Sequence, residues 1–169
     1  MSKMKFMKIK ILLTAMVCIG SINSFAQTSD AEAEAIVNLM GVQKREVIAK
    51  LVSVSGKDSI AFWKLYDEYQ KKNLATGKSR IRLYEETALA YRNMTPGTAD
   101  SLATKYFENR YGQEKTLEEY YKKIKAATNS VIAFEFYQAE VYLLTQIRAS
   151  IMQQIPTYGQ VQAARKKNE

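Results

Sequence analysis

The composition of this chain limits what it can do. It has 169 residues, a formal net charge of +8, no histidine and a single cysteine, Cys18. Without imidazole, and without a thiol beyond residue 18, it lacks the groups of the common hydrolytic triads and of Cys/His zinc sites. Paired carboxylates could still support catalysis, but the acidic residues are spread along polar stretches beside basic ones. We therefore expect no enzyme, no cofactor and no metal site.

The first 26 residues have the pattern of a secretory signal peptide. Four lysines precede an apolar stretch at 11–19, and a small-x-small cleavage sequence follows at 24–26. The apolar stretch is too short to span a bilayer, so we expect cleavage after Ala26, a periplasmic or secreted protein, and no stable membrane insertion. Cys18 lies inside the apolar stretch, which disfavours lipidation there. Cleavage removes four lysines and no acid, and the resulting charge of +4 makes nucleic acid an unexpected partner.

Residues 27–156 are expected to form a single helical domain, because glycine and proline are rare and no alternating strand pattern occurs. The first helix is predicted at Asp30–Ser53, with an apolar stripe at helical spacing. The stripe consists of Ile36, Met40, Val47, Leu51 and Val54.

A second helix is predicted from Ser55 to about Asn93. Ser55 and Asp58 fit a capping box at its start. Gly77 lies inside this helix, but we expect no break there. Residues 18 apart face the same way after five turns, and the apolar stripe keeps its phase from Tyr66 to Tyr84.

Two further helices follow. Thr95 and Pro96 fit the cap and first position of a helix that runs to about Ala126. The last helix starts after residues 128–129 and ends before Pro156, and a flexible basic tail is expected at 157–169. The third helix has inner positions Leu102, Tyr106, Gln113, Leu117, Tyr120 and Ile124. The fourth has Val131, Phe134, Val141, Leu144, Ile147 and Ile151.

The predicted fold class is all-α, with four helices, two of them long, in an elongated and partly open antiparallel arrangement. The inner stripes are rich in tyrosine and alanine rather than leucine, which favours a thin assembly over a compact bundle. Dimerisation is an open alternative for completing it.

Several motifs resemble the Spy/CpxP-like family of periplasmic proteins, which carry a repeated Leu-Thr-x-x-Gln motif. Residues 54–58 and 94–98 stand where the two copies would lie, and Phe62-Trp63-Lys64-Leu65-Tyr66-Asp67-Glu68-Tyr69 is similar to the F-W-x-x-Y-x-x-Y signature of some members. Residues 136–140 resemble an F-x-Q-x-E stretch, and 155–156 a closing Ile-Pro. The family glutamines are absent, since Asp58 and Thr98 occupy their places.

The resemblance implies an exported helical protein that works as an ATP-independent chaperone for unfolded or envelope proteins under envelope stress, often as a dimer. The alternative is a specific regulatory partner, an inhibitor or sensor subunit, of a membrane stress-signalling protein. The family has no catalytic residues to carry over. The helix-start motif would consist of Ser55, Asp58, Thr95 and Pro96.

Two groups of side chains are candidates for client binding. A basic group lies at 71–82, and no acid occurs between Glu68 and Glu85. Its positive charge could attract clients electrostatically, and its cations could stack on aromatic rings. The plain alternative is a solvated helix face. The basic group consists of Lys71, Lys72, Lys78, Arg80 and Arg82. Three of these share one helix face with Lys64, and the candidate cations on that face are Lys64, Lys71, Lys78 and Arg82. The tyrosines expected at the surface are Tyr111, Tyr121 and Tyr142. Gln138 and Glu140 are expected to fix the register of the helices by hydrogen bonding.

Overall fold

The computed structural model describes residues 43–167, and the described part is all-α with no strand. The labelled helices are α3 (Gly56–Ala90, 35 residues), α4 (Pro96–Ala127, 32 residues), α5 (Ser130–Gln154, 25 residues) and α6 (Tyr158–Lys166, 9 residues). Residues 43–51 are also helical. The fold class predicted from the sequence is confirmed. The predicted signal peptide, and the predicted first helix before residue 43, lie outside the described residues.

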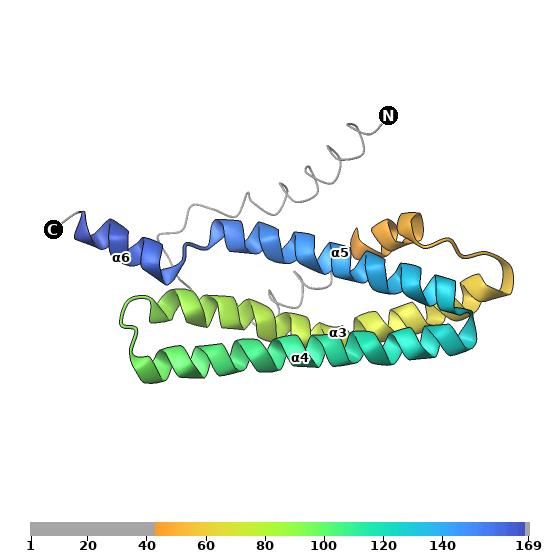
Figure 1. Ribbon diagram of the computed structural model, residues 1–169, viewed down its shortest axis with the longest axis horizontal. Coiled ribbons are helices and arrows are strands. Elements are labelled where there is room, and N and C mark those ends of the chain that lie inside the picture. Colours follow the sequence, from red (N-terminus) through yellow and green to blue (C-terminus); the bar gives the residue numbers. More distant parts are fainter. Residues whose placement is uncertain (1–42, 168–169) are drawn as a thin grey trace, which may run out of the picture.

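The three long helices run along one axis (Figure 1). α3 and α4 form an antiparallel hairpin, and α5 turns back over it, so that α5 runs in the same direction as α3. The helical segment 43–51 lies beside α5, and α6 lies at the opposite end of the molecule. The described part is therefore elongated (Figure 1), and each long helix has many exposed residues.

Local signals account for where the helices begin. The Thr95 hydroxyl accepts a hydrogen bond from the Thr98 amide at 3.1 Å, and Pro96 occupies the first turn, as predicted. Asn129 caps α5 by accepting from the amides of Val131 and Ile132.

The start of α3 differs from the prediction. Ser55 stands at the cap position, but its side chain makes no capping hydrogen bond, so the predicted capping box with Asp58 is wrong. Gly56, the first helical residue, has a φ of +54°. Glycine reaches this left-handed backbone conformation without the steric penalty of a side chain. A glycine turn, rather than a hydroxyl cap, therefore starts this helix.

α3 is continuous across Gly77, as the phase of its stripe predicts, and it ends at Ala90 rather than near Asn93. The tail differs more. Where we expected a flexible segment from residue 157, Thr157 and Gln160 form a capping box that starts α6. The ring of Tyr158 lies 5.6 Å from that of Tyr91 at the end of α3. A helix therefore follows Pro156 and contacts the end of the hairpin.

The core corrects two of the predicted stripes. In segment 43–51 the buried apolar residue is Ile48, while Leu51, predicted to face inward, is exposed. In α5 the side chains of Val131 and Phe134 are 68% and 50% exposed, although both were predicted to be internal. The residues that α5 buries instead are Ile132, Ala133, Phe136, Ala139, Glu140 and Leu143. α5 is apolar on more than one side, so the spacing of its apolar residues does not identify the buried face.

Candidate functional site

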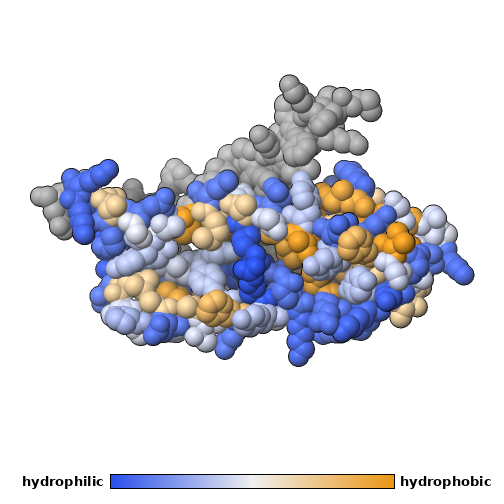
Figure 2. Space-filling model, in the orientation of Figure 1, coloured by the Kyte–Doolittle hydropathy of each residue, from blue (hydrophilic) through white to orange (hydrophobic). Residues whose placement is uncertain are grey.

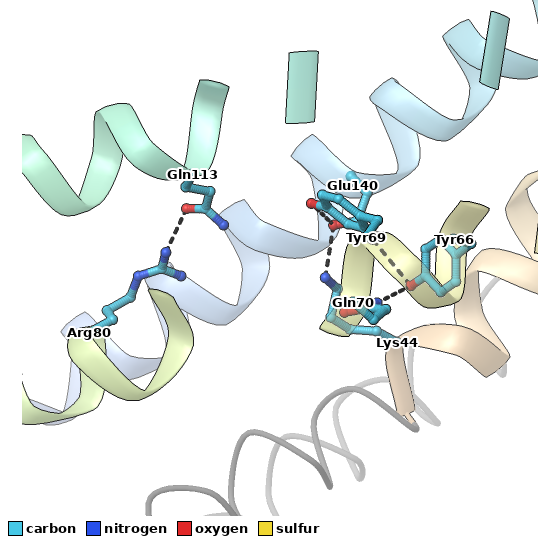
Figure 3. Close-up of polar contacts among 7 residues, drawn as sticks. All are labelled: Lys44, Tyr66, Tyr69, Gln70, Arg80, Gln113 and Glu140. Carbon is cyan, nitrogen blue, oxygen red and sulfur yellow. Dashed lines mark hydrogen bonds and ion pairs between the residues drawn. The ribbon is translucent and has the colours of Figure 1, made fainter. Parts of the chain in front are cut away.

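A cluster of hydrogen-bonded side chains in the described part surrounds the buried carboxylate of Glu140 on α5 (Figure 3). Lys44 donates a hydrogen bond to this carboxylate at 2.8 Å, and so does the Tyr69 hydroxyl at 2.8 Å. The Tyr66 hydroxyl donates to the other carboxylate oxygen at 3.2 Å and accepts a hydrogen bond from Gln70. Three segments distant in sequence thus meet at one acid.

The electrostatics of the cluster favour a charged carboxylate and neutral tyrosines. Glu140 and Lys44 form an ion pair with side chains that are 0% and 10% exposed. Burial, together with the negative charge of Glu140, raises the pKa of Tyr66 and the pKa of Tyr69 well above the usual range. Both hydroxyls therefore remain donors to Glu140 across the physiological pH range.

Aromatic rings enclose this cluster. Phe136 of α5 packs edge-on against Phe62, Tyr66 and Tyr69 of α3, with ring centroids 5.3 to 6.3 Å apart. Tyr69 also contacts Tyr120 of α4 at 5.5 Å. The aromatic signature of α3 and the F-x-Q-x-E stretch of α5, both noted in the sequence, therefore pack against each other. They form the internal junction of three helices rather than an exposed binding surface.

The prediction that Glu140 fixes helix register agrees with these contacts, whereas Gln138 is exposed. Lys44 was not predicted, because nothing in its sequence neighbourhood marks it as the partner of an acid 96 residues away. The sequence offers one indirect indication that Lys44 faces the core: it precedes Ile48 by four residues, which places both side chains on the same face of a helix.

The predicted basic face lies away from this core. Lys71 follows Phe62 by nine residues, about 2.5 turns at ~3.6 residues per turn, so the two side chains point in opposite directions. Lys64 and Lys71 are exposed, but Lys78 is partly buried, and both Lys78 and Arg82 make polar or ring contacts. The four cations therefore do not form a uniform row of free charges.

The three predicted tyrosines lie on α4 and α5, apart from one another. Tyr111 is 70% exposed and its ring stacks on Phe107. Tyr142 is exposed on α5, and Tyr121 is partly buried with its ring against Tyr137. The basic candidates on α3 and the aromatic candidates on α4 and α5 thus lie on different helices.

The exposed surface of α5 is a feature that the sequence reasoning missed. Every exposed residue of α5 among those whose burial is described is uncharged, while its charged residues Glu135, Glu140 and Arg148 are buried or partly buried. The exposed surface of α3, by contrast, carries lysines, arginines and acids. We define the outer face of α5 by six residues: Val131, Phe134, Tyr137, Gln138, Tyr142 and Met152. Figure 2 shows hydrophobic residues at the surface where the start of α5 meets segment 43–51.

Two searches for other kinds of site gave no candidate within residues 43–167. No three His, Cys, Asp or Glu side chains there gather closely enough to hold a metal ion. In the same part of the chain, no helix has both the length and the hydrophobicity needed to cross a bilayer.

No protein-family model matches this chain, and no curated protein and no solved structure matches it significantly. The likeness to Spy/CpxP-like proteins therefore depends on the sequence motifs described above.

Proposed function

We propose that this protein is exported to the periplasm or beyond and binds other proteins through the outer face of α5, as an ATP-independent, chaperone-like client binder. The observation that carries the proposal is the absence of charge from the exposed residues of α5 whose burial is described. Apolar and aromatic groups exposed over a contiguous stretch are typical of interaction surfaces.

The composition of the face suits varied partners. Phe134 and Tyr137 stack with ring centroids 6.5 Å apart, and Tyr121 supports Tyr137 from α4 at 6.4 Å. Tyrosine offers large apolar contact area with little conformational entropy to lose, and Met152 adapts its shape to irregular surfaces. Such a surface binds unfolded segments without a nucleotide-driven cycle.

The test measures how well the purified protein suppresses aggregation of a chemically unfolded, unrelated protein, without ATP and at two salt concentrations. We expect suppression at near-stoichiometric ratios that changes little with salt, because screening weakens interactions between charges and leaves apolar contacts in place. Phe134→Lys should abolish it. Ile60→Lys is the matched control, since Ile60 is an exposed apolar residue of α3 with a 77% exposed side chain.

The outcomes separate the alternatives. High salt is one test of the basic face of α3, and replacement of Lys64 and Lys71 by Glu is another. If either change removes the suppression, the binding site is the basic face of α3 rather than the outer face of α5. Failure of a well-folded, monomeric protein to suppress aggregation would contradict the chaperone proposal and favour the specific regulator of a membrane stress sensor. A dimer that Phe134→Lys dissociates would show that a second copy occupies the outer face of α5.

Mass spectrometry of the exported protein should find Gln27 at its N-terminus if the signal peptide is cleaved as expected.

A further inference from the structure

Beyond the Glu140 cluster, a polar group interrupts the apolar interior of the described part before Leu83 and Leu102, which are buried again. Arg80 lies 18 residues after Phe62, five full turns at ~3.6 residues per turn, and therefore faces the same way as that buried ring. Asn73 lies between them on this face, and its amide oxygen is buried without a hydrogen-bond partner. Figure 3 shows Arg80 and its partner Gln113 as a group separate from the Glu140 cluster.

In the part of the chain that the structure describes, neutral side chains hold Arg80 in place. Its Nε donates to Asn109 Oδ1 at 3.1 Å and its Nη2 donates to Gln113 Oε1 at 2.7 Å, both on α4. Asn109 is itself fixed by a hydrogen bond from its amide nitrogen to the carbonyl of Thr76 at 3.1 Å. A guanidinium has five N–H donors, so two fix its plane and three remain for another acceptor.

A second arginine approaches from the opposite helix. Arg148 lies eight residues beyond Glu140 on α5, and Arg80 lies eleven residues beyond Tyr69, the hydrogen-bond partner of Glu140, on α3. Since α5 runs in the same direction as α3 (Figure 1), both arginines lie beyond the Glu140 cluster toward the same end. Burial lowers the pKa of Arg80, and the positive charge of Arg148 lowers it further. Within residues 43–167, neither guanidinium forms an ion pair with an Asp or Glu. Figure 2 shows strongly hydrophilic residues gathered at mid-length on this face of the molecule.

We propose that Arg80 and Arg148 form a binding site for an oxyanion of the phosphate class, between α3, α4 and α5. Within residues 43–167 these two partly buried cations have no acidic partner, and a bound dianion would offset their mutual repulsion and accept hydrogen bonds from their N–H groups. Planar guanidinium groups bind phosphate oxygens through paired, charge-assisted hydrogen bonds. Two ligands present the same charged phosphate oxygens to such a site, the free phosphate ion and a phosphate monoester. The site is independent of the outer face of α5 and of the protein-binding proposal.

The experiment titrates inorganic phosphate into the purified protein and follows the Nε–H resonances of its arginines by NMR, with ionic strength held constant by chloride. We expect a saturable shift in two resonances, those of Arg80 and Arg148. A phosphate concentration ten times the dissociation constant should also raise the folding equilibrium constant about elevenfold.

Arg148→Gln is the decisive variant, because it leaves the hydrogen bonds of Arg80 to α4 intact. It should weaken phosphate binding about tenfold or more, the effect of one charge-assisted hydrogen bond. In the absence of phosphate it should leave the protein as stable as before or more stable, since it removes a repulsion. Arg165→Gln makes the same change of charge at an exposed position of α6 and should leave phosphate binding unchanged.

Glycerol phosphate is the second probe. Binding at least as tight as that of inorganic phosphate would assign the site to a phosphate monoester, and selective binding of inorganic phosphate would assign it to the free ion; both results support the site. The absence of saturable shifts with either probe would overturn the proposal. Shifts that persist unchanged in Arg148→Gln would also overturn it.

Discussion

The ion pair between Lys44 and Glu140 offers a quantitative test of how the described helices are joined. Glu140→Gln keeps the size of the side chain and hydrogen-bonding groups within reach of both tyrosine hydroxyls, but it leaves Lys44, whose side chain is 10% exposed, without this counter-charge. Lys44→Met does the reverse and leaves a fully buried carboxylate unpaired. Breaking a buried pair from one side typically costs about 3–5 kcal/mol. At about 3 kcal/mol, each single variant should lower the melting temperature by roughly 10 °C.

The double variant distinguishes a strained charge from a merely lost contact. With both charges removed, this pair leaves no unpaired ion inside, and the amide that Glu140→Gln introduces accepts from one tyrosine hydroxyl through its oxygen and donates to the other through its NH2 group. We therefore expect the double variant to lose no more stability than either single variant, which gives a coupling energy of about 3 kcal/mol or more in a double-mutant cycle. Urea denaturation of the four proteins supplies the cycle. Additive losses, within about 0.5 kcal/mol, would refute the reasoning.

Three further predictions concern the helix caps and the titrating groups. Thr95→Ala should lower the free energy of unfolding by about 1 kcal/mol in urea, whereas Ser55→Ala should have almost no effect because its side chain makes no cap hydrogen bond; equal losses would contradict this. The pKa values of Tyr66 and Tyr69 are raised by burial and by Glu140, so their stabilising effect is complete below the unfolded pKa near ~10 and is lost as pH rises further, by up to about 1.4 kcal/mol per pH unit for each. Denaturation at successive alkaline pH values should show this slope, and Tyr66→Phe should reduce it; an unchanged slope would refute the assignment. Hydrogen bonds from Lys123 and Lys72 lower the pKa of the exposed Glu119 carboxyl to about 2. An NMR titration should find that salt raises this pKa toward ~4.3, and insensitivity to salt would count against the surface ion pairs.

Features set by neighbouring residues were predictable from the sequence. The Thr95-Pro96 helix start depends on a few adjacent residues, and the continuity of α3 across Gly77 follows from the phase of one stripe. The start of α3 was not predicted correctly, because a serine at the cap position does not reveal whether its hydroxyl reaches an amide. A positive φ at Gly56 replaces that hydrogen bond.

Features set by distant segments were harder to predict. α5 has apolar residues on several sides, so a periodicity argument chose Val131 and Phe134 as internal when Ile132 and Phe136 are buried. The pairing of Lys44 with Glu140 joins residues 96 positions apart, and no local pattern encodes such a contact. The error on α5 is informative, because the two residues mistaken for core, Val131 and Phe134, belong to the surface on which the functional proposal depends.

The most direct measurement is site-specific photo-crosslinking from the outer face of α5. A photoreactive residue is placed at Phe134 in one protein and at Ile60 of α3 in another, and each is mixed with an unfolded client before irradiation. The account predicts abundant crosslinks from position 134 and few from position 60, with little change in high salt. Equal crosslinking from both positions, or none from position 134 while the protein still suppresses aggregation, would contradict the claim that this face binds clients.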